Sequence, residues 1–254
     1  MNTLTIKEIE IGSGAPKIIV PVVGKTETEL LDEITFLKSI DFDVLEWRVD
    51  HFNLVDDIDA VKDVAKKITQ LLPNKPILFT FRTANEGGVK PWPLKAYIEL
   101  NKEMARSGLV DLIDVEVFIG DEYVTDIINV AHQHQVLVVA SNHDFQKTPS
   151  KSDIIYRLRK MQDLGADIPK IAVMPQTTED VLTLLAATTE MNEKYATRPL
   201  ITMSMAGLGA ISRVAGTTFG SSMTFGAAKN ASAPGQLDIK ELRYILDVLY
   251  RSKA

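Results

Sequence analysis

The sequence contains no cysteine among its 254 residues. This absence excludes disulfide bonds, thiolate metal sites and a cysteine nucleophile, and it is compatible with a reducing cytoplasm. No apolar run reaches about 18 residues, the length that suggests a membrane-spanning helix. The N-terminus, MNTLTIKEIEIGSG, lacks a basic segment followed by an apolar core, so no signal peptide is predicted. Together these absences favour a cytoplasmic protein.

An excess of positive charge is also missing. Lys and Arg number 28 against 34 Asp and Glu, which gives a formal net charge of −6. A general nucleic-acid-binding protein needs a basic face, so this class is not expected. His132 and His134 are two residues apart near the end of a predicted helix, so their side chains diverge and no metal site is predicted.

Short apolar segments alternate with amphipathic segments along nearly the whole chain. Most of the apolar segments are short and rich in β-branched residues, as buried parallel strands are. The expected strands are residues 17–23, 43–49, 76–83, 112–118, 136–143, 169–175, 199–205 and 222–228. Helical signals lie between them, such as the capping-box pattern of Thr26 and Glu29 just before LLDEITFL.

Alternating strand–helix units imply a parallel sheet. Eight such units in a chain of this length predict a closed (β/α)₈ barrel, with a doubly wound open sheet as the alternative. The first residues, TLTIKEIEIG, alternate like a small hairpin, and we expect residues 1–14 to cover the bottom of the barrel. No linker or charge block marks a second domain, so we expect one domain across residues 1–254.

Polar residues alternate with large apolar ones near the ends of several expected strands. In LEWRVDHF, residues 45–52, Glu46 and Arg48 share one parity, and Arg82 repeats the pattern in the third strand. Glu86 follows in RTANEGG, whose glycines allow a tight turn. Because alternate residues of barrel strands point inward and active sites lie at the C-terminal ends of the strands, a polar pocket is predicted.

Later segments supply more candidates for this pocket. His143 ends the fifth expected strand, and Asp114 and Glu116 in the fourth are expected mainly to neutralise the arginines. The other candidates lie on the seventh strand and in the last two loops: Met203, Met205, Arg213, Ser232 and Gln236.

Lys170 lies in the apolar segment IPKIAVMP. A lysine buried among apolar side chains tends to lose its charge, and a neutral amine can attack a carbonyl to form an imine. Its position before the apolar run favours the other interpretation, in which the side chain extends out of the bottom of the barrel.

Seven segments, in order and at fitting spacings, resemble the type I 3-dehydroquinate dehydratase family of the shikimate pathway. They are LEWRVDHF, FTFRTANEGG, GLVDLIDVEVF, VVASNHDFQKTP, LGADIPKIAVMP, ITMSMAGLGAISRVAGTTFGSSMTFG and ASAPGQL. The resemblance implies a Schiff-base (β/α)₈ barrel, usually dimeric, that needs neither metal nor nicotinamide. It also implies that the small-molecule substrate is 3-dehydroquinate, which loses water to give 3-dehydroshikimate.

The resemblance also implies roles for the candidate residues. Lys170 forms the imine with the substrate ketone, His143 shuttles the proton, and Glu86 orients His143 and helps hold its charge. We therefore expect the pKa of His143 to lie near the working pH. Arg213 holds the substrate carboxylate. The remaining implied roles are hydroxyl binding and pocket order for Glu46, Arg48 and Arg82, loop closure for Ser232 and Gln236, and packing against the ring for Met203 and Met205.

Two positions depart from the family pattern. Pro21 stands where some members have a substrate-contacting serine, and AGLGA, residues 206–210, stands where others carry a lysine. We expect both to alter affinity or loop motion rather than chemistry. Two alternative functions are a Schiff-base aldolase, which would need a phosphate site that is not evident, and a non-catalytic sensor of quinate-like ligands.

Overall fold

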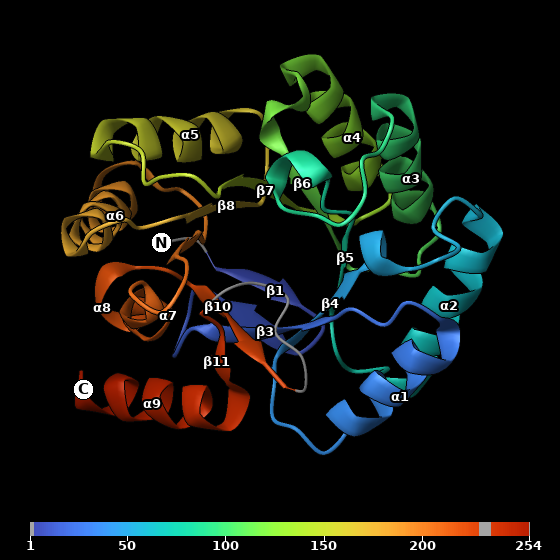
Figure 1. The fold of residues 1–254 in the computed structure, drawn as a ribbon, viewed down its shortest axis with the longest axis horizontal. Coiled ribbons are helices and arrows are strands. Elements are labelled where there is room, and N and C mark those ends of the chain that lie inside the picture. The colour runs from blue at the N-terminus through green and yellow to red at the C-terminus, as the bar shows by residue number, and fades with distance from the viewer. Residues whose placement is uncertain (1–2, 229–234, 254) are drawn as a thin grey trace.

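The computed structural model of the protein describes residues 3–228 and 235–253. Strands β3 to β10 form the wall of a barrel, and the helices surround it (Figure 1). The barrel strands are Lys17–Val22 (β3), Val44–Arg48 (β4), Ile77–Thr80 (β5), Leu112–Glu116 (β6), Leu137–Asp144 (β7), Ile168–Val173 (β8), Ile201–Ser204 (β9) and Met223–Ala227 (β10). The short strand Leu237–Asp238 (β11) pairs with β10 in parallel.

A helix, or two short ones, follows each barrel strand on the outside of the barrel. The helices are Glu27–Leu37 (α1), Ile58–Leu71 (α2), Leu94–Arg106 (α3), Asp121–Gln133 (α4), Lys151–Asp163 (α5), Thr178–Glu190 (α6), Ala210–Val214 (α7), Gly216–Phe219 (α8) and Ile239–Ser252 (α9). Local capping starts several of them. The Thr26 side chain, for example, accepts a hydrogen bond from the backbone N–H of Glu29 at the start of α1, as its pattern predicts.

The parallel sheet runs without a break from β10 through β3 to β9. Its two ends meet through a bridge between Leu200 and Ser221, and the backbone N–H of Ser222 donates to the carbonyl of Leu200 at 2.8 Å. These contacts close the sheet, so the (β/α)₈ barrel prediction is confirmed and the open-sheet alternative is wrong.

One buried apolar residue from each barrel strand points into the lower end of the barrel. We call these residues the lower layer: Ile19, Val44, Leu78, Leu112, Val139, Ile168, Ile201 and Met223. They belong to one packed cluster, which fills the interior below the strand ends.

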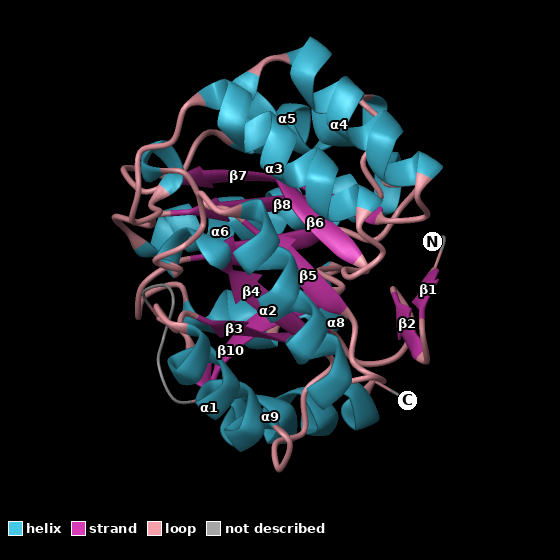
Figure 2. Ribbon diagram, turned by 90° about the vertical axis from the view of Figure 1, so that its right-hand side faces the viewer, coloured by secondary structure: helices cyan, strands magenta, loops and turns pink. Residues whose placement is uncertain are grey.

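The N-terminal hairpin covers this lower layer. Strands Leu4–Ile6 (β1) and Ile9–Ile11 (β2) pair antiparallel, and Ile6 and Ile11 join the cluster of the lower layer. Figure 2 shows the hairpin at one end of the barrel. At its tip, the Lys7 amine lies 3.0 Å from a carboxylate oxygen of Asp111, just before β6. The expected hairpin cover is therefore present. Within the described ranges, no helix is long and apolar enough to cross a membrane.

Candidate active site

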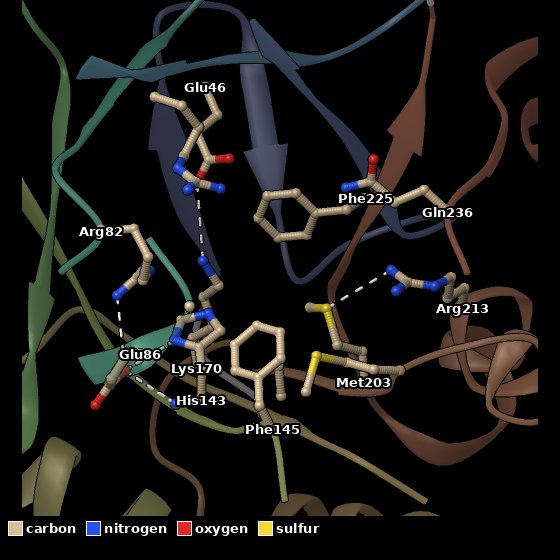
Figure 3. Close-up of a pocket in the computed structure, with 14 residues that line it drawn as sticks. Glu46, Arg82, Glu86, His143, Phe145, Lys170, Met203, Arg213, Phe225 and Gln236 are labelled. Atoms are coloured by element: carbon tan, nitrogen blue, oxygen red, sulfur yellow. Dashed lines mark hydrogen bonds and ion pairs between the residues drawn. The ribbon is translucent and has the colours of Figure 1, made fainter. Parts of the chain in front are cut away.

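Two residues beyond the lower layer, the interior of five of these strands becomes polar. We call these residues the polar layer: Glu46, Thr80, Asp114, Ser141 and Lys170. All are buried, and none is more than 3% exposed. The predicted polar pocket is present, because Glu46 and Lys170 line a cavity at the C-terminal ends of the strands (Figure 3).

Lys170 lies inside the barrel and does not extend out of its bottom. Strand β8 begins at Ile168, so that residue fills the lower layer and Lys170 stands one inward-facing position above it. The Lys170 amine is 3.0 Å from a carboxylate oxygen of Asp114, 3.8 Å from one of Glu46, and 4.6 Å from the Phe225 ring centroid. Its surroundings therefore include two carboxylates as well as apolar groups, and the alternative in which Lys170 extends out of the bottom of the barrel is wrong.

His143 and Glu86 form a close pair at the mouth of the cavity. Nδ1 of His143 lies 2.9 Å from Oε2 of Glu86, and the backbone N–H of His143 donates to the same oxygen at 2.9 Å. The amide of Asn142 donates to the other Glu86 oxygen at 3.2 Å. Since Glu86 accepts from this side, we assign the Nδ1–H tautomer to neutral His143, which leaves Nε2 as an acceptor.

The loop that carries Glu86 depends on two glycines. Gly87 has φ +87°, a left-handed conformation that favours glycine. A Cβ on Gly88 would lie 1.8 Å from the carbonyl oxygen of Arg82, so this position accepts no side chain without a shift of the backbone. The tight turn predicted for RTANEGG is thus confirmed, and it directs Glu86 toward β7.

The charges around His143 and Glu86 shift the pKa values of both groups. Burial, together with the cations Arg82, Lys170 and Arg48, holds the pKa of His143 well below its ordinary value. Burial raises the pKa of Glu86 to about 8, with repulsion from Glu116 adding to it and attraction from Arg82 opposing it. The expectation that the pKa of His143 lies near the working pH is therefore wrong. Because the two groups are in contact, the proton lost near pH 8 belongs to the pair.

Arg82 lines the cavity, and two carboxylates hold its guanidinium in place. Its guanidinium contacts Asp114 at 2.7 Å and Glu116 at 3.0 Å, and it donates to the Ser141 hydroxyl at 2.9 Å. Burial works against its charge, but these carboxylates raise the pKa of Arg82 well above its ordinary value. The expectation that Asp114 and Glu116 neutralise an arginine is confirmed. The contact of Asp114 with Lys170 was not predicted from the sequence.

Arg213 approaches the cavity from helix α7, and Figure 3 shows it across from Glu86 and Arg82. It is 1% exposed, and burial lowers its pKa to about 10. Its Nη1 lies 3.7 Å from the sulfur of Met203. Met205 and Gln236 also line the cavity, whereas Ser232 lies outside the described residues.

A family model described as Type I 3-dehydroquinase matches residues 18–253. The chain belongs to the type I 3-dehydroquinase family. A curated "3-dehydroquinate dehydratase" of Salmonella typhimurium is 54% identical over 252 residues, which cover 99% of this chain and 100% of that protein.

Two solved structures of the family show how closely the fold agrees. The type I 3-dehydroquinate dehydratase of Clostridium difficile, solved with covalently modified comenic acid, has a TM-score of 0.97 and 52% identity, covering 99% of each chain. The 3-dehydroquinate dehydratase of Geobacillus kaustophilus has a TM-score of 0.96 and 38% identity, covering 100% of this chain and 98% of that one.

Three further residues at or beside the site were not predicted from the sequence. Asp50 is fully buried and binds the Arg48 guanidinium through both carboxylate oxygens, at 2.8 and 2.9 Å. Burial alone would raise the pKa of Asp50, but Arg48 keeps it below its ordinary value. Its parity matches Glu46 and Arg48, which was the available signal. Phe145 and Phe225 line the cavity, and the Phe145 ring stacks on that of His143 with centroids 6.5 Å apart.

One of the two departures from the family pattern, Pro21, lies beside the site. Pro21 is buried on β3 and is in register with Glu46. The influence of Pro21 and of residues 206–210 on affinity or loop motion stays a prediction. Within residues 3–228 and 235–253, no group of three or more His, Asp or Glu is arranged to hold a metal ion.

Proposed function

We propose that this chain dehydrates 3-dehydroquinate to 3-dehydroshikimate through an imine formed on Lys170, as a step of the shikimate pathway. The observation that carries the proposal is the placement of a buried lysine and an oriented histidine in one cavity. Membership of the 3-dehydroquinase family favours this reaction over the aldolase and sensor alternatives. The residue roles below are part of the proposal.

Imine formation joins the Lys170 nitrogen to the ketone carbon, and the ketone oxygen leaves as water. The amine attacks the carbonyl to give a carbinolamine, which then loses hydroxide with a proton. The resulting iminium withdraws electrons from the neighbouring C2 more strongly than a ketone does. The C2–H bond is thereby weakened, which is what the next step requires.

Elimination then uses His143 twice. Nε2 takes the proton from C2, the electron pair moves toward the iminium nitrogen, and it returns to expel the C1 hydroxyl as the histidine protonates that oxygen. One imidazole serves both groups when they lie on the same face of the ring, which makes the elimination syn. Glu86, 2.9 Å from Nδ1, fixes the ring and balances the charge that His143 carries between the two transfers. Hydrolysis of the product imine restores Lys170.

The remaining residues of the cavity bind the substrate. Arg213 suits the planar carboxylate, because a guanidinium can donate two parallel hydrogen bonds. Glu46, Arg48 and Arg82 bind hydroxyls and order the pocket. Gln236 lies over the substrate, and the apolar packing against the ring comes from Met203 and Met205. The loop-closure role expected for Ser232 falls outside the described residues and stays a prediction.

Two measurements test the function. Adding 3-dehydroquinate should raise the ultraviolet absorbance as the conjugated enone of the product forms, and a flat trace would reject the dehydratase activity. Borohydride added with the ligand should attach it permanently, and peptide mapping should place the added mass on Lys170. Added mass on a different lysine would reject the assigned nucleophile.

We also propose that the chain is a cytoplasmic homodimer and folds as one domain across residues 1–254. The family resemblance supports the dimer, and the absence of cysteine supports the compartment. Light scattering of the purified protein should give twice the 28.1 kDa chain mass. Unfolding should follow one transition by calorimetry and by fluorescence.

A further inference from the structure

Asp114 connects the reactive lysine to the arginine cluster. One carboxylate oxygen lies 3.0 Å from the Lys170 amine. The other accepts from Arg82 at 2.7 Å and from the Ser141 hydroxyl at 2.6 Å. Asp114 is fully buried on β6, so these contacts are not weakened by water. The carboxylate is therefore fixed against the nitrogen that changes its bonding during the reaction.

No other described carboxylate has this relation to the lysine. Glu46 is 3.8 Å from the same nitrogen and also accepts from the Thr80 hydroxyl at 3.0 Å. Glu116 contacts Arg82, and its other oxygen accepts from the Thr83 hydroxyl. Among the residues that the structure describes, Asp114 thus makes the shorter ion pair with Lys170.

The chemistry of imine formation gives the ion pair between Asp114 and Lys170 a role in the reaction. A protonated amine and a ketone give a protonated imine and water, because two ammonium protons leave with the oxygen and one stays on nitrogen. The nitrogen thus carries one positive charge before and after the condensation. Only the protonated imine is a strong electron sink, so an imine that lost its proton would stall before C2 is deprotonated.

We propose that Asp114 is a catalytic residue that serves as the fixed counterion of the Lys170 imine and keeps its nitrogen protonated through both chemical steps. The proposal rests on the proposed function, since it requires the imine. Asp114 is suited to the role because its charge persists. Burial opposes ionisation, but Arg82 and Lys170 outweigh it and lower the pKa of Asp114 to about 2.

The other charged groups near this nitrogen do not replace Asp114. Arg48, Arg82 and Arg213 are cations, which disfavour a protonated imine, and His143 is a base. Glu46 is the remaining anion of the cavity near the nitrogen, at the longer distance given above. The charged or titratable groups that face the pair are Glu46 and Arg48 from β4, Arg82 and Glu86 after β5, Glu116 from β6, His143 from β7 and Arg213 from α7.

The test is reductive trapping as a function of pH. Sodium cyanoborohydride reduces protonated imines, so the rate of mass gain on Lys170 in the presence of 3-dehydroshikimate reports protonation of the nitrogen. In the wild-type protein the rate should vary little between about pH 6 and pH 9. In Asp114→Asn the pH at which trapping falls to half should move down by about 1–3 units, the range expected for removal of a close opposite charge. Identical profiles would overturn the proposal.

Glu116→Gln is the matched control. It removes the other carboxylate from Arg82 but no partner from Lys170, so it should leave the pH profile of trapping in place. If Glu116→Gln shifts the profile as much as Asp114→Asn does, the effect comes from the position of Arg82 and the counterion role is wrong. Asp114→Glu keeps the charge and should restore much of the wild-type profile.

A measurement on the wild-type protein covers the case in which Asp114→Asn does not fold. The Raman C=N stretch of the complex with 3-dehydroshikimate should move when H₂O is replaced by D₂O, and it should still do so at about pH 9, above the pH near 8 at which Glu86 loses its proton. A stretch that no longer responds there would overturn the proposal. Failure of the wild-type protein to trap any ligand would instead reject the imine itself, so the two failures are distinguishable.

Discussion

The lower layer and the polar layer lie on the same strands, one inward-facing position apart, yet they differ completely in chemistry. Leu112 and Ile168 pack against the hairpin, whereas Asp114 and Lys170, two residues later, make an ion pair. A step of two residues along a strand is only about 6.5 Å. The lower layer therefore lies directly below the charged side chains of the polar layer and excludes water from them on that side. Exclusion of water strengthens the ion pairs of the polar layer.

The difference separates stability from activity. Substitutions of the catalytic residues that line the cavity should lower turnover in a folded protein, whereas substitutions in the lower layer should weaken the fold but leave the chemistry intact. Four variants test this separation, in order of decreasing effect on activity.

Lys170→Met should have the largest effect on activity. It removes the only group that we propose to bond to substrate, so turnover should fall by about 10⁴-fold or more, as for loss of other catalytic nucleophiles. The circular dichroism spectrum should stay native, because Met fills the same space. Lys66→Met, at an exposed position of α2, is the control and should keep full activity. Equal losses of activity in Lys170→Met and Lys66→Met would contradict the role of Lys170.

His143→Ala should lower kcat by about 10²–10⁴-fold, the usual contribution of a general acid–base group. The imine should still form, because Lys170 is intact, so borohydride should still attach the ligand. Mass spectrometry should find the bound species without loss of the C1 hydroxyl. His134→Ala, at an exposed position, should turn over normally. Normal turnover by His143→Ala would reject the shuttle assignment.

Glu86→Gln should change the pH dependence more than the maximal rate. In the wild-type protein Glu86 becomes a carboxylate near pH 8, and the carboxylate accepts from Nδ1–H of His143 and leaves Nε2 as the base, so kcat/KM should rise through this pH. Without the carboxylate, the imidazole titrates alone with its lowered pKa, and the rise should occur at a lower pH. The maximum should fall by about 10²-fold or less. A kcat/KM profile with an unchanged midpoint would contradict the coupling.

Leu112→Ala should leave kcat and KM of the folded protein nearly unchanged. Leu112 is 1% exposed, and truncation of such a side chain lowers the free energy of unfolding by about 2–5 kcal/mol. Urea unfolding measures the loss. Leu182→Ala on α6, at a position 53% exposed, should change the free energy of unfolding by less than about 0.5 kcal/mol. A large loss of kcat in Leu112→Ala would show that the floor also shapes the chemistry.

Most of the fold was predictable because the barrel has a strict inside–outside alternation. The eight predicted strands match the observed ones to within a few residues, since β-branched runs and turn residues mark them locally. The inward parity of Glu46 and Arg48 followed from their apolar neighbours. The contact between Leu200 and Ser221 that closes the barrel could not be predicted from the sequence, because a single bridge between distant segments leaves no local pattern.

The site was less predictable from residues alone. The height of Lys170 in the barrel depends on where β8 begins, and a difference of one residue at the strand start made it look like a residue of the barrel floor. The role of Asp50 depends on the path of the chain after β4. The pKa of His143 depends on cations from three other segments, which no linear pattern brings together. The family resemblance supplied the assignments that parity did not.

The N-terminal hairpin and the lower layer have a consequence for the traffic of small molecules. Because apolar packing plugs one end of the barrel, the cavity lined by the described residues has its mouth at the strand ends and none through the bottom of the barrel. Substrate, product and the released water must all pass through this mouth in turn. Product should therefore exclude substrate and inhibit competitively, because the described residues leave no exit through the bottom of the barrel.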